Sequence, residues 1–359
     1  LRKEAAMRLW EDKIRRVEPY TPGEQPSGEN LVKLNTNENP YPPSPLVKKA
    51  LEEMDPAQFR KYPDPASGIL VQALSETYGM EPERFFVGVG SDDVLGMAFL
   101  TFFNSDKPIL FPSITYSFYP VWADLFRIPW EAVPVGEDMS IRTEDYKKAN
   151  GGVIFPNPNA PTGLLLSLDQ VEEIVRANED VIVIVDEAYI DFGGRSAMDL
   201  TRKYDNLLAV QTFSKSRAMA GMRIGFGVGN PELIRALNNV KYSYNSYTMS
   251  LAAQRLGAAA LKDQAYFEET RKKIISTREK AKKRLRELGF SFPDSMTNFI
   301  FAEHCRAEAG PMFRAMKEAG IYVRYFDKPG LDNRLRITIG TEEEMEQLYR
   351  FLESYLADR

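Results

Sequence analysis

Short apolar runs of strand length alternate with helical segments through the middle of the chain, from about residue 85 to residue 228. Val181–Val185 is an unbroken β-branched run, and Leu207–Gln211 and Ile224–Val228 are predominantly apolar. Strands that are apolar on both faces are typical of a parallel sheet that helices cover on both sides. The pattern therefore predicts an α/β fold with a mostly parallel central sheet.

The length of the chain and the change of pattern along it indicate more than one domain. The 359 residues exceed the size of most single domains. Residues 1–29 read as an N-terminal arm, which must dock on its own body or on a partner chain. We expect residues 30–247 to form a large domain. Residues 248–359, in which long helices precede three strands, are expected to form a smaller α+β domain.

Composition argues against several classes of function. The net charge of −5 gives no electrostatic basis for binding nucleic acid or an anionic membrane. The sequence has no apolar run long enough to span a membrane, and Leu1–Glu4 lack the apolar core of a signal peptide. Cys305 is the only cysteine, which fits a reducing compartment. A cytoplasmic protein is therefore expected.

The single histidine limits the chemistry further. A Ser–His–Asp triad, a Cys–His dyad or a multi-histidine metal site would each have to use His304. That residue ends a predicted strand and reads as a surface or packing histidine, and no metal site is expected. If the protein is an enzyme, its reactive base is then expected to be a lysine, or a cofactor carries out the difficult step.

Polar side chains follow the predicted strands at the point where each strand ends. In parallel sheets, ligands bind beyond the carboxyl ends of the strands. The Gly90–Asp92 turn also opens a helix, whose free N–H groups and dipole favour an anion. Each such residue alone has an ordinary structural interpretation as a cap, a core side chain or an ion-pair partner, but scattered caps would not all fall on one edge. The residues that share this position are Ser91, Tyr116, Asn159, Asp186, Tyr189, Ser214 and Lys215.

These residue types suit pyridoxal phosphate, a pyridinium aldehyde that carries a phosphate. A lysine such as Lys215 can hold the aldehyde as a Schiff base, and an ionised Asp186 can keep the ring nitrogen protonated. Tyr189, three residues further on, can reach the ring hydroxyl. Arg223 offers a guanidinium fork to the phosphate oxygens. The order of these pieces along the chain predicts a site for this cofactor.

Eight segments of the chain resemble the fold-type I pyridoxal-phosphate aminotransferases. They are LNTNENPYPPSP, RKYPDP, GVGSDD, TYSFY, PNPNAPTG, VDEAYIDF, TFSKSRAMAGMRIGF and RLRITIGT. The resemblance covers nearly the whole chain and implies that Lys215 is the Schiff-base lysine and then the base that moves the substrate proton. Asp186 and Tyr189 are its implied partners at the ring nitrogen and the ring oxygen.

The resemblance also implies the remaining contacts and a homodimer, because one cofactor contact would come from the other subunit. The implied cofactor contacts are Ser91, Asp92, Thr212, Ser214 and Arg223 around the phosphate, Tyr116 stacked on the ring, Asn159 at the ring oxygen and Tyr62 reaching across from the other subunit. The implied substrate contacts are Tyr20, Asn37, Arg324 and Arg336.

Within this family the segments favour transamination of L-histidinol phosphate with 2-oxoglutarate, which gives imidazole-acetol phosphate and glutamate and belongs to histidine biosynthesis. Two alternatives remain open: a lyase like the threonine-phosphate decarboxylases, which use the same cofactor site, and an aromatic amino-acid aminotransferase. The chain departs from the family pattern at Asn159-Ala160, where a pair of asparagines is usual, and in Lys241–Tyr247, which lacks an expected proline. The second departure bears on substrate choice.

Overall fold

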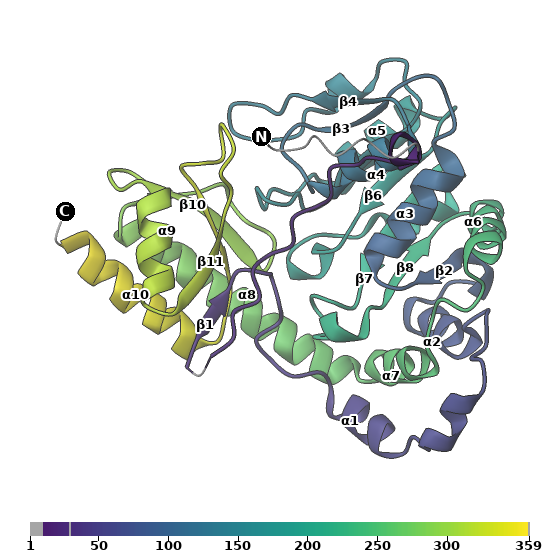
Figure 1. Cartoon of the computed structure of the whole chain (residues 1–359), viewed down its shortest axis with the longest axis horizontal. Coiled ribbons are helices and arrows are strands. Elements are labelled where there is room, and N and C mark those ends of the chain that lie inside the picture. The colour runs from purple at the N-terminus through teal and green to yellow at the C-terminus, as the bar shows by residue number, and fades with distance from the viewer. Residues whose placement is uncertain (1–9, 29, 358–359) are drawn as a thin grey trace, which may run out of the picture.

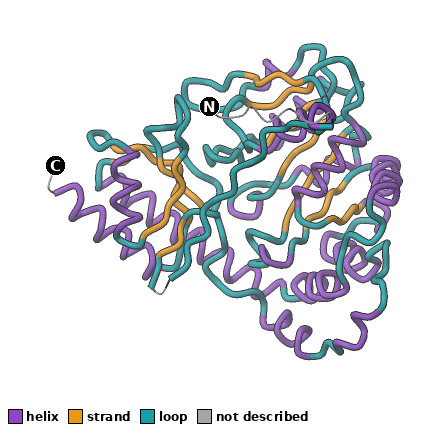
Figure 2. Tube along the Cα trace, viewed as in Figure 1, coloured by secondary structure: helices purple, strands orange, loops and turns teal. Residues whose placement is uncertain are grey.

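The computed structural model of the chain describes residues 10–28 and 30–357, and these residues form two sheets with their own helices (Figure 1). The larger sheet has seven strands in the order β2-β8-β7-β6-β5-β3-β4, and the smaller has five in the order β1-β11-β12-β10-β9. Figure 2 shows both sheets bordered by helices, with the connections drawn as loops. The predicted α/β fold, with a large sheet domain and a smaller α+β domain, is confirmed.

The seven-stranded sheet is parallel except for one strand. β8 pairs antiparallel with both β2 and β7, whereas the other neighbours pair in parallel. The strands are β2 (Phe85–Gly88), β3 (Ile109–Pro112), β4 (Trp130–Val133), β5 (Val153–Pro156), β6 (Val183–Asp186), β7 (Leu207–Thr212) and β8 (Gly225–Val228). The edge strand β4 is absent from the sequence-based assignment because most of its side chains are partly or fully exposed, so it lacks an apolar run.

Helices cover both faces of this sheet, as the doubly apolar strands predict. Ile184 packs in a cluster with side chains of α3 and α6, while its neighbours Val183 and Val185 pack in a separate cluster with side chains of α5. Successive side chains of β6 therefore point to opposite faces of the sheet, and both faces are buried. The helices of this region are α1 (Pro45–Glu52), α2 (Gly68–Tyr78), α3 (Ser91–Phe102), α4 (Phe118–Phe126), α5 (Leu168–Ala177), α6 (Pro231–Tyr244) and α7 (Leu251–Lys262).

The five-stranded sheet carries three helices and its own apolar core. Its elements are β1 (Val32–Leu34), β9 (Phe290–Ser291), β10 (Phe299–His304), β11 (Ile321–Tyr325), β12 (Leu335–Thr338), α8 (Gln264–Glu287), α9 (Ala309–Glu318) and α10 (Glu342–Ala357). Short 3₁₀ turns complete the chain: η1 (Glu11–Lys13), η2 (Pro56–Arg60), η3 (Pro82–Arg84), η4 (Thr143–Tyr146), η5 (Ile190–Phe192), η6 (Ala197–Arg202) and η7 (Ala220–Met222). His304 is a packing residue: it is buried, and its ring lies edge-on to Phe290.

The two sheets do not follow the predicted domain boundary between residues 247 and 248. β1 pairs in parallel with β11, so the strand that follows the arm belongs to the smaller sheet. α7 packs on the larger domain instead, because Leu256 joins Leu70 and Leu74 of α2 in one core cluster. Sequence spacing could not place either element, since both contacts join segments far apart along the chain.

The described part of the predicted arm lies against the chain's own body. Figure 1 shows it running from beside α4 across to β1. Tyr20 stacks on Phe118 at 4.5 Å between ring centroids, Arg15 donates to the Leu125 carbonyl, and Glu24 pairs with Lys317 at 2.8 Å. Residues 1–9 and 29 of the arm lie outside the described residues. Among those described, every helix is too short or too polar to cross a membrane.

Candidate active site

Except for Tyr62, the predicted site residues of the large domain meet at the carboxyl edge of the parallel strands. β8 runs against its neighbours, so Arg223, which precedes it, reaches the same edge as the residues that follow β2, β6 and β7. Direct contacts link the groups: Arg223 lies 3.2 Å from Asp92, and the Lys215 ammonium lies 5.7 Å from the Tyr189 ring centroid. Residues far apart in the sequence therefore share one site.

Asp186 is the last residue of β6, and its side chain is buried. Its carboxylate accepts hydrogen bonds from the Tyr119 hydroxyl at 2.9 Å and from the Ala188 N–H at 3.2 Å. Burial raises the pKa of Asp186 to about 6, and these two hydrogen bonds act against that rise. Sequence reasoning missed Tyr119, because an apolar residue of α4 gives no signal of a contact with the distant Asp186.

The turn between β2 and α3 is built around Arg223. Gly90 has a positive φ of 86°, and a Cβ there would lie 2.5 Å from Nη2 of Arg223. A Cβ on Gly225 would lie 2.3 Å from the Gly90 backbone. Two glycines thus let the guanidinium and β8 approach the start of α3. There, the free N–H groups at Ser91 and Asp92 and the cation together can bind an anion.

Hydroxyl groups complete this anion site. Nη1 of Arg223 lies 3.4 Å from the Ser214 hydroxyl, which in turn accepts a hydrogen bond of 3.0 Å from Thr212. Arg223 itself has a φ of 52°, a conformation that non-glycine residues rarely adopt. The guanidinium reaches the turn after β2, where its Nη2 lies 3.2 Å from Asp92, while the side chain stays partly exposed.

The Lys215 side chain points toward the smaller domain. Its Nζ donates to the carbonyl of Thr36 at 3.2 Å. The side-chain amide of Asn37 donates to the Tyr189 hydroxyl at 2.9 Å. The segment after β1 therefore contributes directly to the site, as the sequence predicts for Asn37. The neighbouring Asn39, which donates to the backbone of the lysine turn, was missed.

Tyr116 and Asn159 lie on the loops that follow β3 and β5. The Tyr116 hydroxyl donates to Asp92 at 2.9 Å, and burial holds its pKa well above the ordinary tyrosine value, so it stays a donor. The Asn159 amide nitrogen donates to the Ile114 carbonyl at 2.9 Å, whereas its Oδ1 is buried and has no hydrogen-bond partner among the described residues. A buried acceptor of this kind needs a donor, and a ring hydroxyl of a bound cofactor would supply one.

A second group of predicted residues lines the smaller-domain side. Arg324 and Arg336 are directly opposite each other on the antiparallel strands β11 and β12. Arg336 is partly buried: its Nη2 donates to the Asn35 carbonyl at 3.0 Å, and its Nε is buried with no hydrogen-bond partner among the described residues. Tyr20 completes this side. Burial raises its pKa, and the two arginines partly offset that rise.

One predicted residue lies apart from the others within the chain. Tyr62 is 82% exposed and stacks on Tyr247 at 4.7 Å between ring centroids. It therefore contributes nothing to the site of its own chain, although its exposed position is what a contact with a second subunit requires.

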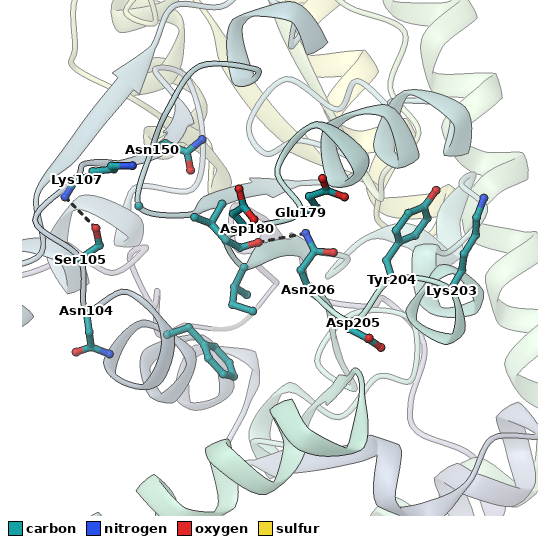
Figure 3. A pocket seen from close by; sticks show the side chains of 14 residues that line it. Asn104, Ser105, Lys107, Asn150, Glu179, Asp180, Lys203, Tyr204, Asp205 and Asn206 are labelled. Carbon is teal, nitrogen blue, oxygen red and sulfur yellow. Dashed lines mark hydrogen bonds between the residues drawn. The ribbon is translucent and has the colours of Figure 1, made fainter.

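A cavity of about 830 Å³ lies at the opposite, amino edge of the sheet (Figure 3). Its lining residues precede strands instead of following them, among them Lys107 before β3, Asn150 before β5 and Asn206 before β7. None of the predicted site residues lines it. Within the described residues, no cluster of three histidine, cysteine, aspartate or glutamate side chains could hold a metal ion.

Comparisons with known proteins give matches over most of the chain. The family model for aminotransferase class I and II matches residues 29–352. The chain is 52% identical to a histidinol-phosphate aminotransferase of Brachyspira hyodysenteriae, over 93% of this chain and 95% of that protein. It is 46% identical to one of Lactococcus lactis subsp. cremoris, over 98% of both.

Solved structures are similar over most of the chain. That of histidinol-phosphate aminotransferase from Sinorhizobium meliloti in complex with pyridoxal-5'-phosphate has a TM-score of 0.82 and 25% identity, covering 91% of each chain. The enzyme of that name from Clostridium acetobutylicum has a TM-score of 0.83 and 23% identity, covering 92% of this chain and all of that one. The second likeness concerns the fold alone.

Proposed function

Because the chain belongs to the class I and II aminotransferases and uses pyridoxal phosphate, we propose that it transfers the amino group of L-histidinol phosphate to 2-oxoglutarate. The products are imidazole-acetol phosphate and glutamate, and the reaction belongs to histidine biosynthesis. The names of the full-length relatives support this substrate. The structural observation that carries the proposal is the facing pair of arginines on β11 and β12.

Arg324 and Arg336 form a site for an anion. Like charges directly opposite each other on neighbouring strands are destabilising, and burial together with Arg324 lowers the pKa of Arg336. A bound anion offsets this repulsion and supplies the acceptor that the buried Nε of Arg336 lacks. The phosphate of histidinol phosphate would occupy this place in one half-reaction, and a carboxylate of 2-oxoglutarate in the other.

The large-domain residues hold the cofactor and move the proton. Pyridoxal phosphate, when bound, supplies an electron sink for the bonds of the substrate carbon. We assign Lys215 to hold the cofactor covalently and, after its release, to transfer the substrate proton. Asp186 pairs with the ring nitrogen and is largely ionised above its pKa of about 6. Tyr189 and Asn159 orient the ring through its oxygen.

The remaining residues fix the two ends of the ligands. Ser91, Asp92, Thr212, Ser214 and Arg223 surround the cofactor phosphate, and Tyr116 stacks on the ring. On the substrate side, Tyr20 is held in place by its stacking on Phe118. Asn37 connects the two sides because it bonds both Tyr189 and Thr338.

We also propose that the working unit is a homodimer. Tyr62 and Tyr247, which stack on each other, are both exposed, and so are Phe59 and Tyr244, which are near them in the sequence. Contact with a second copy would bury them and bring each Tyr62 to the cofactor phosphate of the other subunit. A cytoplasmic location accompanies the proposal, since Cys305 is free and exposed and would stay reduced there.

The experiment that tests the function mixes the yellow holoenzyme with histidinol phosphate alone and follows the visible absorbance. Conversion to the pyridoxamine form, reversed by 2-oxoglutarate, is the expected result. Carbon dioxide release from threonine phosphate, without conversion by histidinol phosphate, would instead indicate a lyase. Conversion by aromatic amino acids alone would indicate an aromatic aminotransferase.

A further inference from the structure

The turn that carries Lys215 is unusual in its backbone conformation. Ala218, at its end, has a φ of 56°, a left-handed value that alanine rarely adopts. Its N–H closes the turn on the Lys215 carbonyl at 3.3 Å. Backbone of this kind persists only where surrounding groups hold it. The position of the lysine side chain therefore depends on contacts made by the turn around it.

One side chain contacts the two successive carbonyls of this turn. The Asn39 amide nitrogen donates to the Lys215 carbonyl at 3.0 Å and to the Ser216 carbonyl at 3.1 Å. Its oxygen accepts the N–H of Tyr41 at 3.0 Å. A primary amide has two N–H donors on one nitrogen, so a single planar group fixes both carbonyls and its own backbone at the same time.

Asn39 stands at the end of a strap, residues 35–39, that the smaller domain holds in place. The Asn37 carbonyl accepts from Asn298 at 3.0 Å, its N–H donates to Thr338 at 3.0 Å, and the Asn35 carbonyl accepts from Arg336 at 3.0 Å. The strap thus connects the proposed substrate anion site to the backbone of the proposed reactive lysine.

We propose that Asn39 is a positioning residue for Lys215: its amide sets the backbone of the lysine turn and thereby the place of Nζ relative to the cofactor ring. This inference rests on the proposed role of Lys215. The hydrogen bonds of the amide go to backbone groups of Lys215, Ser216 and Tyr41, so it acts through the backbone. The Ser216 hydroxyl, which donates to Asp191, and Arg217, which donates to the Ala260 carbonyl at 3.3 Å, hold the turn from its other side.

The test is the Asn39→Asp holoenzyme. Aspartate keeps the shape and the acceptor for Tyr41 but has no N–H to donate to the two carbonyls. Asn206→Asp is the matched control. The Asn206 amide donates to the carbonyls of Val175, Asn178 and Val181 at the opposite edge of the sheet, where Figure 3 shows it. The Asn206→Asp variant therefore loses comparable hydrogen bonds, but none of them is made to the lysine turn.

The first measurement is the pH titration of the visible absorbance of the lysine–cofactor linkage, which reports its protonation independently of turnover. We expect Asn39→Asp to shift the midpoint by about half a pH unit or more, and Asn206→Asp to leave it unchanged. We also expect kcat to fall about tenfold to a hundredfold in Asn39→Asp, with KM within about threefold of wild type, because misplaced reacting groups affect the chemical step.

If Asn39→Asp has the same titration midpoint and the same kcat as the wild type, the proposal is wrong. It is also wrong if Asn206→Asp shifts the midpoint by the same amount as Asn39→Asp. Asn39→Ala, which lets water reach the carbonyls, replaces Asn39→Asp if the latter does not fold. If neither variant folds while Asn206→Asp does, the amide is a structural residue and the proposal is wrong. Failure of the wild type to turn over histidinol phosphate would refute only the proposed substrate, because the absorbance titration needs no substrate.

Discussion

Tyr119 donates a hydrogen bond of 2.9 Å to Asp186, and both side chains are buried. The pKa of Asp186 is raised to about 6 by burial, against the effect of this hydrogen bond. The pKa of Tyr119 lies well above its ordinary value, chiefly through burial, so its hydroxyl keeps the proton and remains the donor. The pair therefore sets the pH range in which the carboxyl at the proposed ring-nitrogen position carries its charge.

The affinity of the apoprotein for pyridoxal phosphate should fall as the pH decreases through about 6, because protonated Asp186 cannot pair with a pyridinium nitrogen. Tyr119→Phe removes a bond that lowers the Asp186 pKa, so the transition should move to higher pH. Fluorescence titrations with the cofactor at several pH values measure this. Asp186→Asn should bind the cofactor weakly at every pH and show no transition in affinity. If Tyr119→Phe and the wild type give the same dependence of affinity on pH, the prediction is wrong.

Lys215→Ala should abolish the visible absorbance of the lysine–cofactor linkage and reduce turnover by at least about a thousandfold, since both the covalent hold and the base are lost. The exposed Lys203, which pairs with Glu172, supplies the control. Lys203→Ala should keep absorbance and turnover, because an exposed ion pair is worth about 0–1 kcal/mol. Retained turnover in Lys215→Ala would refute the assigned mechanism.

Gly90→Ala should weaken cofactor binding, because the added Cβ would meet the Arg223 guanidinium at 2.5 Å and displace it from the phosphate site. Gly79 is a matched control: its φ is also positive, at 62°, but nothing lies within 4 Å of the added Cβ. Gly79→Ala should lose about 1 kcal/mol of stability with normal cofactor affinity.

Thermal unfolding and equilibrium dialysis with pyridoxal phosphate separate these two effects. Gly90→Ala should lose about 1–3 kcal/mol through its backbone conformation, and in addition about tenfold or more in affinity through the displaced charge-assisted bonds. If both glycine variants bind the cofactor equally well, the close approach of Arg223 to Gly90 has no role in binding.

Arg324→Gln should raise KM for histidinol phosphate about tenfold or more, because a hydrogen bond to a charged group is worth about 1.5–3 kcal/mol. The same change removes the like-charge contact with Arg336, so the substrate-free protein should be as stable as wild type or up to about 1 kcal/mol more stable. Steady-state kinetics and thermal unfolding measure the two effects. Arg350→Gln, at an exposed pair on α10, should change neither.

The stability of the smaller domain should fall in acid through His304. Burial lowers its pKa, and its Nδ1 accepts hydrogen bonds from the N–H groups of Arg306 and Ala307, which protonation would break. The folded state thus binds this proton less tightly than the unfolded state. The contribution is fully present above the unfolded pKa of about 6.5 and declines as the pH falls below it.

Urea unfolding of wild type and His304→Gln at neutral and mildly acidic pH tests this. The difference in free energy of unfolding between the two proteins should be larger at neutral pH and become smaller in acid. The comparison is needed because the raised pKa values of Asp186 and Glu187 act in the opposite direction, favouring the folded state as the pH falls. A difference that does not change with pH would contradict the assignment.

The carboxyl edge could be predicted because its positions follow from local pattern. Each parallel strand is an apolar run, and the polar residue after it must lie at the same edge as the others. Asp186, Ser214 and Lys215 are placed by this rule alone. Arg223 fits it only because β8 is antiparallel, which its own residues do not reveal.

What the sequence could not predict depends on contacts between distant segments. Tyr119 reads as an apolar helix residue until the position of Asp186 is known, and Asn39 reads as part of a turn until the lysine turn lies beside it. β4 lacks an apolar run because it is a half-exposed edge strand. The partner of β1 has no local signal, since a three-residue strand fits either sheet equally well.

The pairing of β1 with β11 has a consequence for how the chain acquires its structure. β1 leaves the ribosome before any strand of the larger sheet, but its partner β11 is made after all of them. At roughly 5–20 residues per second, β1 and the strap behind it wait on the order of tens of seconds for the smaller sheet. The larger sheet can assemble during this time, whereas the Asn37 and Asn39 contacts acquire their support from the smaller domain only after β12 has been made. A nascent chain stalled before β11 would therefore carry the reactive lysine without the segment that holds it in place.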